Sequence, residues 1–271
     1  MRLDIRIAAL FAALLAVLPA VAFAQTDEIQ VYDGGLAPVG TFNLTLHSNF
    51  TPKGVTTPAF PGAVVADKSF NGVPEWALGV TRWFEAGLYL PLYSRDKDTG
   101  LGLDGFKLRA LFAVPDADDR KFFYGANFEF SINARRWDTT RFTSEVRPII
   151  GWHLKPVDII INPIFDTAYD GLQNLVFVPA TRVAYNFPSG WALAVEEYDD
   201  FGSIHAFAPR GEQAHQIFAV VDRRWKEWDI EAGIGAGFTG ASDRLTLKLI
   251  LSRDLNKRAT AGSTAPAPAH P

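Results

Sequence analysis

One pattern recurs along most of this chain: apolar and polar side chains alternate residue by residue. In residues 41–50, for example, Phe42, Leu44 and Leu46 stand between polar residues. Successive side chains of a β-strand point to opposite faces, so such a segment has one apolar and one polar face. Twelve segments between residues 41 and 255 follow this pattern. The sequence therefore predicts an all-β chain of about 12 antiparallel strands.

The start of the chain indicates export. Arg2 and Arg6 precede an apolar run over residues 7–21, and small residues follow at Ala22 and Ala24. This arrangement predicts a secretory signal peptide over residues 1–24. The apolar run is also shorter than the roughly 20 residues that a membrane helix requires.

Three further segments follow the signal peptide. We expect residues 25–40 to form an N-terminal periplasmic segment and residues 41–255 to form the strands. Residues 256–271 are rich in Ala and Pro, which predicts a disordered tail. The chain has no cysteine, so disulfides do not stabilise it, and a long hydrogen-bond ladder or a large core has to do so.

The links between the predicted strands alternate between short and long. The longer or more polar links are residues 51–72, 94–103, 133–141, 167–174 and 199–213, while residues 239–243 form a short exception. Short periplasmic turns and long outer loops are typical of outer-membrane barrels. Because lipid cannot satisfy an open sheet edge, the strands of such a protein close into a ring. We therefore predict a closed antiparallel transmembrane β-barrel in the outer membrane of a Gram-negative cell.

The tryptophans support this interpretation over a water-soluble β-sandwich. Five of the seven lie beside the predicted short turns, namely Trp83, Trp152, Trp191, Trp225 and Trp228. Tryptophan favours the membrane interface, where the ring is buried and its N–H meets polar groups. The polar faces also contain many Gly and Ala residues, which suit a crowded lumen better than a solvated surface.

Four prolines lie inside predicted strands, and proline cannot donate a hydrogen bond to the ladder. They are Pro91, Pro148, Pro163 and Pro179. If the turn centres between Lys155 and Pro156, then Pro148 and Pro163 face each other across the hairpin. Two interpretations follow: a local bulge or early strand end, or a weak seam through which the wall opens sideways to lipid.

The alternation places a set of charged side chains on the inner face of the barrel, as candidates for the lumen and its selectivity. They are Glu75, Lys107, Arg109, Glu129, Glu145, Arg147, Asp158, Arg182, Glu196, Asp229, Glu231 and Lys248. Acids and bases fall on adjacent strands, as in Arg182 with Glu196 and Glu231 with Lys248. Either the charges pair and fill the interior, or they form a constriction that filters solutes.

Other functional classes find little support in the sequence. The formal net charge of −4 argues against nucleic acid as a partner. No Gly-x-Ser-x-Gly elbow is present, so we predict no enzyme, no catalytic residues, no cofactor and no metal. The expected partners are outer-membrane lipid, the barrel-assembly machinery and a small solute that the sequence does not identify.

Several short stretches resemble a known family. They are Glu28-Ile-Gln-Val-Tyr-Asp33, Pro38-x-Gly40, Leu44-Thr-Leu-His-Ser-Asn-Phe-Thr51, Pro74-Glu75, Gly79-Val-Thr-Arg-Trp-Phe-Glu-Ala-Gly-Leu-Tyr-Leu-Pro91 and Gly105-Phe-Lys-Leu-Arg109. The chain is similar here to the "MetA-pathway of phenol degradation" family of outer-membrane proteins, over residues 28–255. The resemblance implies an outer-membrane barrel that acts in transport, including transport of aromatic or apolar compounds, and it supplies no catalytic residues.

Two functional hypotheses remain. The first is a channel or transporter for small solutes, aromatic or apolar compounds among them, with a charged lumen. The second is a non-transporting structural or surface-binding barrel whose lumen is plugged by its own salt bridges and by the segment before Thr41. An open lumen favours the first hypothesis and a filled lumen favours the second.

Overall fold

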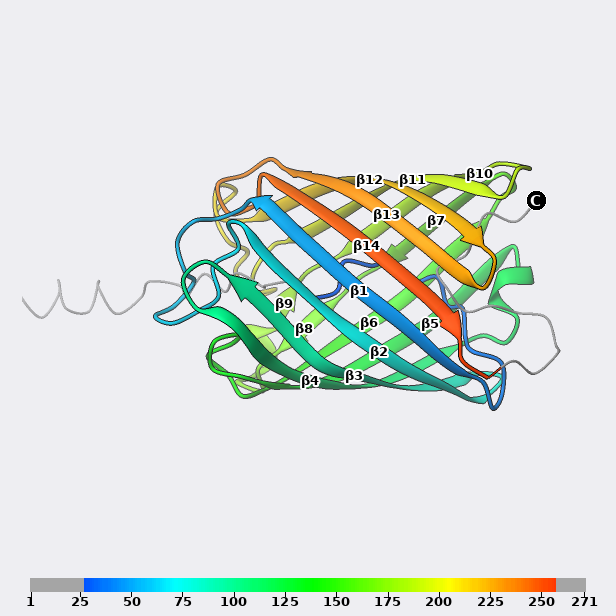
Figure 1. Ribbon diagram of the computed structural model, residues 1–271, viewed down its shortest axis with the longest axis horizontal. Coiled ribbons are helices and arrows are strands. Elements are labelled where there is room, and N and C mark those ends of the chain that lie inside the picture. The colour runs from blue at the N-terminus through cyan, green and yellow to red at the C-terminus, as the bar shows by residue number, and fades with distance from the viewer. Residues whose placement is uncertain (1–26, 257–271) are drawn as a thin grey trace, which may run out of the picture.

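The computed structural model describes residues 27–256, which form one barrel of tilted strands (Figure 1). The predicted signal peptide, residues 1–24, lies outside the described residues. So does the predicted tail, apart from Asn256, whose side chain accepts a hydrogen bond from the backbone N–H of Phe42 (2.6 Å).

Fourteen strand segments make up the wall. They are β1 (Phe42–Lys53), β2 (Ser69–Thr81), β3 (Phe84–Asp96), β4 (Gly100–Ala113), β5 (Phe122–Asn133), β6 (Phe142–His153), β7 (Val157–Asn162), β8 (Phe165–Thr167), β9 (Val176–Phe177), β10 (Ala180–Asn186), β11 (Trp191–Asp200), β12 (Ala214–Trp225), β13 (Trp228–Gly237) and β14 (Leu245–Asp254). Two short 3-10 helices, η1 (Ala117–Asp119) and η2 (Leu172–Asn174), lie in the connections.

These segments form a closed ring of 12 strands. All neighbouring strands are antiparallel, β1 pairs with β14, and β5 pairs with β6, which closes the ring. Segments β7 and β8 are the two halves of one strand, because both pair with β6. Segments β9 and β10 likewise form one strand beside them. The prediction of a closed antiparallel 12-stranded barrel is confirmed.

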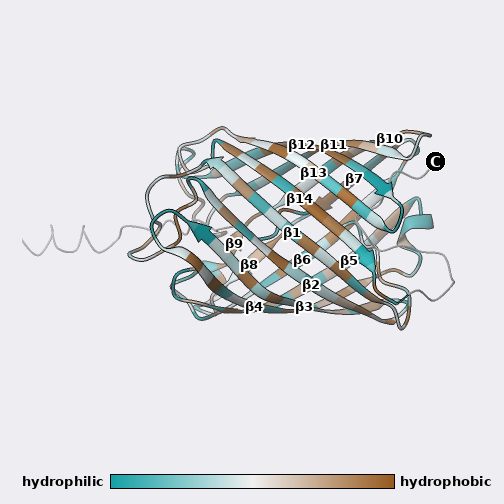
Figure 2. Ribbon diagram, in the orientation of Figure 1, coloured by the Kyte–Doolittle hydropathy of each residue, from teal (hydrophilic) through white to brown (hydrophobic). Residues whose placement is uncertain are grey.

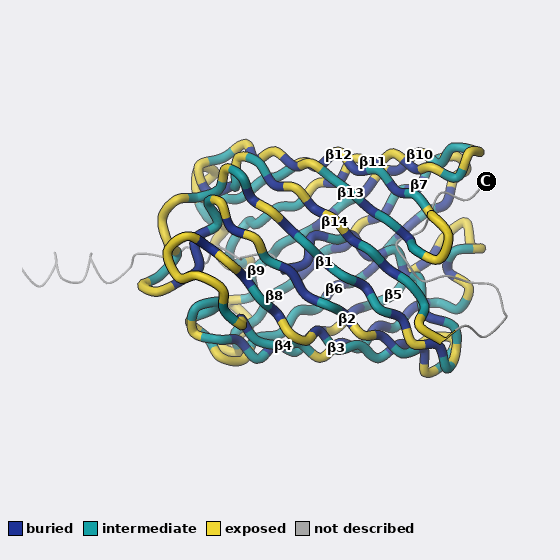
Figure 3. Tube along the Cα trace, in the orientation of Figure 1, coloured by how far each residue is buried: buried dark blue, intermediate teal, exposed yellow. Residues whose placement is uncertain are grey.

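The alternation separates an apolar outer face from a polar inner face. Figure 2 shows apolar and polar residues alternating along the strands, and Figure 3 shows the matching alternation of exposed and buried positions. The outward side chains of Leu108, Val195 and Ile234 are 50–55% exposed. Apolar side chains exposed in this way around a closed barrel face the hydrocarbon of the membrane. No helix within residues 27–256 is long and apolar enough to cross a membrane.

The connections follow the predicted asymmetry with one difference. The long links after β1, β5, β8 and β11 gather at one end, and the short turns gather at the end where the described chain finishes (Figure 1). The expected longer link at residues 94–103 is instead a tight turn between β3 and β4. The Asp96 carboxylate accepts hydrogen bonds from the backbone N–H groups of Asp98 and Thr99 (both 2.7 Å). This side-chain turn lets both strands continue further than their apolar alternation indicates.

Candidate functional site

The segment before β1 lies inside the barrel. Residues 27–39, which we call the plug, start in the lumen and lead to the short-turn end (Figure 1, dark blue). Val31 and Tyr32 are buried against the inward-facing Phe123 and Ile149. Within the segment expected over residues 25–40, residues 27–39 therefore lie along the lumen, because their apolar side chains find a core inside the ring.

Cations of the lumen hold the outer end of the plug. Lys107 Nζ lies 2.9 Å from the Asp27 carboxylate, and Lys248 Nζ donates to the carbonyl oxygen of Ile29 (3.1 Å). Arg147 Nη1 donates to the next carbonyl oxygen along the plug (3.0 Å). These bonds satisfy backbone and side-chain acceptors that would otherwise be buried without a partner.

Tyr32 anchors the middle of the plug. Its backbone N–H donates to Asn162 Oδ1 (2.7 Å), and its carbonyl oxygen accepts from Asn162 Nδ2 (3.0 Å). Its hydroxyl lies 2.5 Å from the Tyr89 hydroxyl, and the Arg147 guanidinium lies 4.4 Å from its ring centre. The plug is therefore bound to several strands of the wall.

The structure places all 12 predicted lumen charges on the inner face. Lys107 and Glu145 are partly exposed to the lumen, and the others are buried. The buried set is Glu75, Arg109, Glu129, Arg147, Asp158, Arg182, Glu196, Asp229, Glu231 and Lys248. Most of these charges therefore fill the interior; Glu145 and Arg147 also border its open part.

One group, which we call the Lys248 cluster, consists of Lys248, Arg182, Glu196, Asp222 and Glu231. Lys248 contacts Glu196 and lies 2.6 Å from Glu231, and Arg182 contacts Glu196 and Asp222 and lies 3.5 Å from Glu231. Both pairs expected from adjacent strands, Arg182 with Glu196 and Glu231 with Lys248, are present. The carboxylates of such a buried group are fully paired with cations only while both Lys248 and Arg182 are present.

A second group lies on the opposite wall. Arg109 lies 2.7 Å from Glu75 and also contacts Glu85, while His47 Nε2 lies 3.1 Å from Glu75. Glu85 also accepts a hydrogen bond from the backbone N–H of Ala37 (2.5 Å), so this group holds the inner end of the plug.

The sequence-based candidates omit several residues of the site. Glu85 and Asp222 fall on inward positions of their strands, so the alternation contained the information needed to find them. The sequence did not indicate a role for Asp27, Glu28 or Tyr32. The plug has no strand periodicity, and its partners are remote in sequence.

Above the plug, the outer half of the barrel holds a cavity of about 860 Å³, which we call the vestibule. Its floor is formed by Asp27, Glu28, Lys107, Glu145 and Arg147, and its upper walls come from the outer loops. This volume is typical of a site for a small organic molecule.

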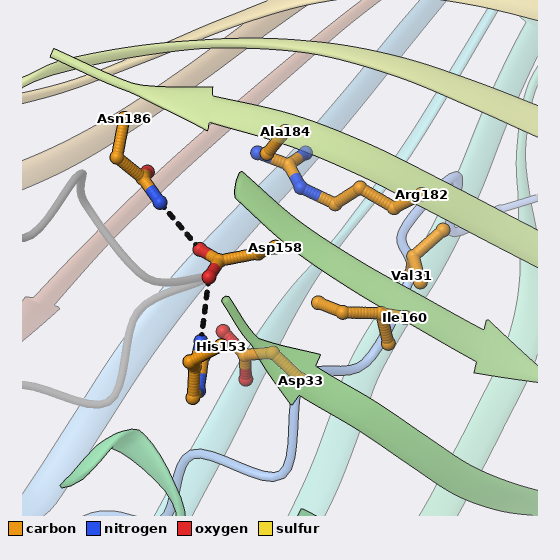
Figure 4. Close-up of a pocket in the computed structure, with 8 residues that line it drawn as sticks. All are labelled: Val31, Asp33, His153, Asp158, Ile160, Arg182, Ala184 and Asn186. Carbon is orange, nitrogen blue, oxygen red and sulfur yellow. Dashed lines mark hydrogen bonds and ion pairs between the residues drawn. The ribbon is translucent and has the colours of Figure 1, made fainter. Parts of the chain in front are cut away.

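On the short-turn side, a small cavity lies beside the plug. It measures about 10 Å³, room for about one water molecule, and lies among the eight residues drawn in Figure 4. There Asp158 accepts a hydrogen bond from Asn186 (2.6 Å) and pairs with His153 (2.8 Å). The vestibule and this small cavity lie on opposite sides of the plug.

Three of the predicted in-strand prolines form a row across the wall. On the side facing β7 and β8, the ladder of β6 stops at Val146 and resumes at Ile150. The register is the same on both sides of this gap, which places Pro148 opposite Pro163. The β8–β9 pairing and the β7–β10 pairing also share one register, which places Pro163 opposite Pro179 between them. The expected facing of Pro148 and Pro163 is confirmed, and we call the three residues the proline row.

The proline row is a weak part of the wall. None of the three residues has a backbone N–H to donate, so the ladder lacks donors at one height across three adjacent strands. In lipid, a carbonyl oxygen without a donor has no water to replace it. Toward β6, the pairing is interrupted between Val146 and Ile150 with no shift in register. Toward β9 and β10, the strands stay joined beside the row, because the backbone N–H of Val178 donates to the carbonyl oxygen of Ile164 (3.0 Å).

The closed ring, its apolar outer face and its polar filled interior together define an outer-membrane β-barrel. A comparison with known family models finds no match, and a comparison with curated protein sequences finds none either. The resemblance to the phenol-degradation family is therefore not confirmed.

Solved structures give the fold independently. The chain is similar to an outer membrane channel from Pseudomonas putida F1, with 14% identity and a TM-score of 0.55, over 84% of this chain and 100% of that chain. It is more loosely similar to the NanC porin, with 9% identity and a TM-score of 0.49 over 80% and 100% of the two chains. It is also loosely similar to the translocator domain of the autotransporter NalP from Neisseria meningitidis, with 11% identity and a TM-score of 0.45, over 92% of this chain and 97% of that chain. The first likeness agrees with the outer-membrane barrel fold, and the two looser ones carry no further argument.

Proposed function

We propose that this protein is an outer-membrane channel for small apolar or aromatic compounds, which enter the vestibule from outside and leave sideways through the proline row. The interrupted pairing between β6 and β7–β8 at Pro148 and Pro163 carries the proposal. Neither proline can donate a backbone hydrogen bond, so fewer bonds have to break for these strands to separate here.

The plug supports a sideways route over a straight one. The vestibule ends at Asp27 and Glu28, and below them the plug is bound to β3, β4, β6, β7 and β14. A solute that follows the barrel axis has to displace these bonds, including buried contacts to charged groups that cost about 1.5–3 kcal/mol each.

The surface between the vestibule and the proline row is apolar. Ile164 and Val178 line the vestibule beside the row, and both pack with Ile149 and Ile160 on the inner face. An apolar solute gains free energy from contact with this surface, at about 25 cal/mol for each Å² removed from water. A hydrated ion gains nothing there, so the route favours apolar compounds.

A reversible crosslink tests the route. The chain has no cysteine, so the double variant Val146→Cys/Phe165→Cys introduces one defined disulfide. These two residues are paired in the β6–β8 ladder, two residues from Pro148 and Pro163, which stay in place. Directly opposed residues in antiparallel strands lie within the Cα separation of about 4.4–6.8 Å that a disulfide requires. We expect oxidised cells to lose uptake of the neutral dye 1-N-phenylnaphthylamine, whose fluorescence rises in membranes, and we expect a reductant to restore it.

The matched control is Val195→Cys/Ala219→Cys, which joins two opposed residues of β11 and β12, away from the row. Its disulfide should leave uptake unchanged. Equal uptake in the oxidised and reduced Val146→Cys/Phe165→Cys protein would refute the sideways route.

The buried charge groups and the bound plug also fit the second hypothesis, a non-transporting barrel with a filled lumen. The two functions differ in one measurement. A non-transporting barrel produces no dye uptake above that of cells without the protein, whether or not the crosslink is formed.

A further inference from the structure

The lining of the vestibule is strongly acidic. Eleven carboxylate side chains line it, against two cationic ones, Lys107 and Arg147. The whole chain is nearly balanced, with 30 acidic and 26 basic residues. The acidity is therefore a property of this cavity, and low-dielectric walls concentrate its field.

The floor of the vestibule has more carboxylates than its own cations can neutralise. Lys107 pairs with Asp27 (2.9 Å) and Glu129 (3.3 Å). Arg147 binds Glu145 through two nitrogens (2.7 and 3.0 Å). The same floor holds the carboxylates of Glu28 and Asp166. Five carboxylates and two cations leave a formal excess of three negative charges.

Asp166 adds to this excess at a defined position. It lies directly opposite Glu145 in the β6–β8 ladder, and both side chains point into the vestibule. Like charges directly opposite each other on one face of a sheet destabilise the pairing. A cation between the two carboxylates would remove that cost.

Glu28 gives independent evidence for a missing partner. Its side chain is 2% exposed, and neither carboxylate oxygen has a hydrogen-bond partner among the described residues. The nearest cation, Arg147 Nη1, lies 3.7 Å away, beyond hydrogen-bond reach. A buried carboxylate left without a donor is costly, and this one borders the vestibule.

The vestibule also has an apolar side. Ile164, Val176 and Val178 contribute to its lining on the wall that carries the proline row, and Phe207 of the loop after β11 lines it as well and stacks on Phe177. We infer that the vestibule binds a small organic cation, with its ammonium group at Glu28, Glu145 and Asp166 and its apolar body against Ile164 and Val178. This inference rests on the proposed function, because it names the chemistry of the compound that enters the vestibule.

Calorimetric titration of the full-length barrel in detergent tests the inference with three probes of similar shape. They are 2-phenylethylammonium, neutral 2-phenylethanol and anionic 3-phenylpropionate. Hydrogen bonds to charged groups contribute about 1.5–3 kcal/mol. We therefore expect the ammonium compound to bind at least about tenfold more tightly than the alcohol, and the anion not to bind.

Two variants locate the ammonium group. Asp166→Asn keeps the shape of the side chain and removes one of two opposed charges, so it should fold and should weaken ammonium binding about tenfold. Glu28→Gln should weaken it similarly. The control is Asp170→Asn, which removes an exposed carboxylate of the same cavity and should leave the affinity within about twofold of the wild type.

Each outcome separates this inference from the proposed function. Equal affinity for the ammonium compound and the alcohol, or binding of Ca²⁺ without binding of the ammonium compound, would overturn the inference whatever the crosslink does to uptake. An equal loss in Asp170→Asn and Asp166→Asn would overturn the placement at the floor. Selective ammonium binding together with uptake that ignores the crosslink would support the inference and refute the sideways route.

Discussion

Replacing Lys248 by methionine is expected to destabilise the barrel by about 3–5 kcal/mol, the cost of breaking a buried ion pair by removing one partner. The Lys248 side chain is 0% exposed and contacts Glu196 and Glu231. In the variant, Arg182 alone faces three carboxylates, Glu196, Asp222 and Glu231. The hydrogen bond to the Ile29 carbonyl of the plug is lost as well.

Urea unfolding of the protein in lipid vesicles, followed by tryptophan fluorescence, measures the free energy of unfolding by linear extrapolation. The second variant, Lys248→Met/Glu231→Gln, removes a carboxylate together with the cation. It should recover about 1–3 kcal/mol relative to Lys248→Met alone, because the two residues are in direct contact. Lys53→Met, at an exposed position at the end of β1, is the control and should stay within about 0.5 kcal/mol of the wild type.

Two results would contradict the expected role of Lys248. A Lys248→Met protein as stable as Lys53→Met would mean that the cluster does not depend on this ammonium group. A double variant less stable than Lys248→Met would mean that the carboxylates are not left uncompensated in the single variant.

Two further predictions concern the plug. Deleting residues 27–37 should raise single-channel conductance in planar bilayers, and Glu145→Ala or Arg147→Ala in the deleted protein should shift its ion selectivity; an unchanged conductance would mean that the plug does not obstruct the lumen. Burial, reinforced by the charge of Asp33, raises the pKa of Asp118, in the turn after β4, from 3.8 to about 7. The folded protein then holds a proton that the unfolded chain releases near pH 4, so the contribution of Asp118 to stability falls as pH rises from about 4 to about 7. Asp118→Asn should remove about 1–2 kcal/mol of this fall, allowing for partial exposure; unfolding curves at pH 5 and pH 8 that respond equally in both proteins would contradict this.

Side-chain alternation was sufficient to predict the barrel wall, because each strand must present one face to lipid and one to the lumen. It also identified inward charges such as Lys248 and Arg182, and the facing of Pro148 and Pro163. The limits of the strands were harder to predict. The tight turn at Asp96 depends on a side chain that closes the backbone, and alternation carries no information about such a contact.

The second functional hypothesis placed the segment before Thr41 in the lumen, but the contacts that hold it there lay beyond sequence-based prediction. The bonds of the plug join Ile29 to Lys248 and Tyr32 to Asn162, residues separated by 219 and 130 positions. No local pattern encodes contacts of this range, and a segment of mixed composition before the first strand reads as a connector. The acidic excess of the vestibule was equally hidden, because the loops and strands that supply it become neighbours only in the closed ring.

The position of the plug in the chain has a consequence for assembly. The plug is joined directly to β1, and the ring closes when β1 pairs with β14, the last strand of the chain. Lys248, which binds the plug, lies on that last strand. The nascent chain therefore completes its wall around a segment that was made first, and the final strand contributes both to closing the ring and to holding what it encloses. A barrel closed without its plug would leave Lys107, Arg147 and Lys248 without the bonds that the plug provides.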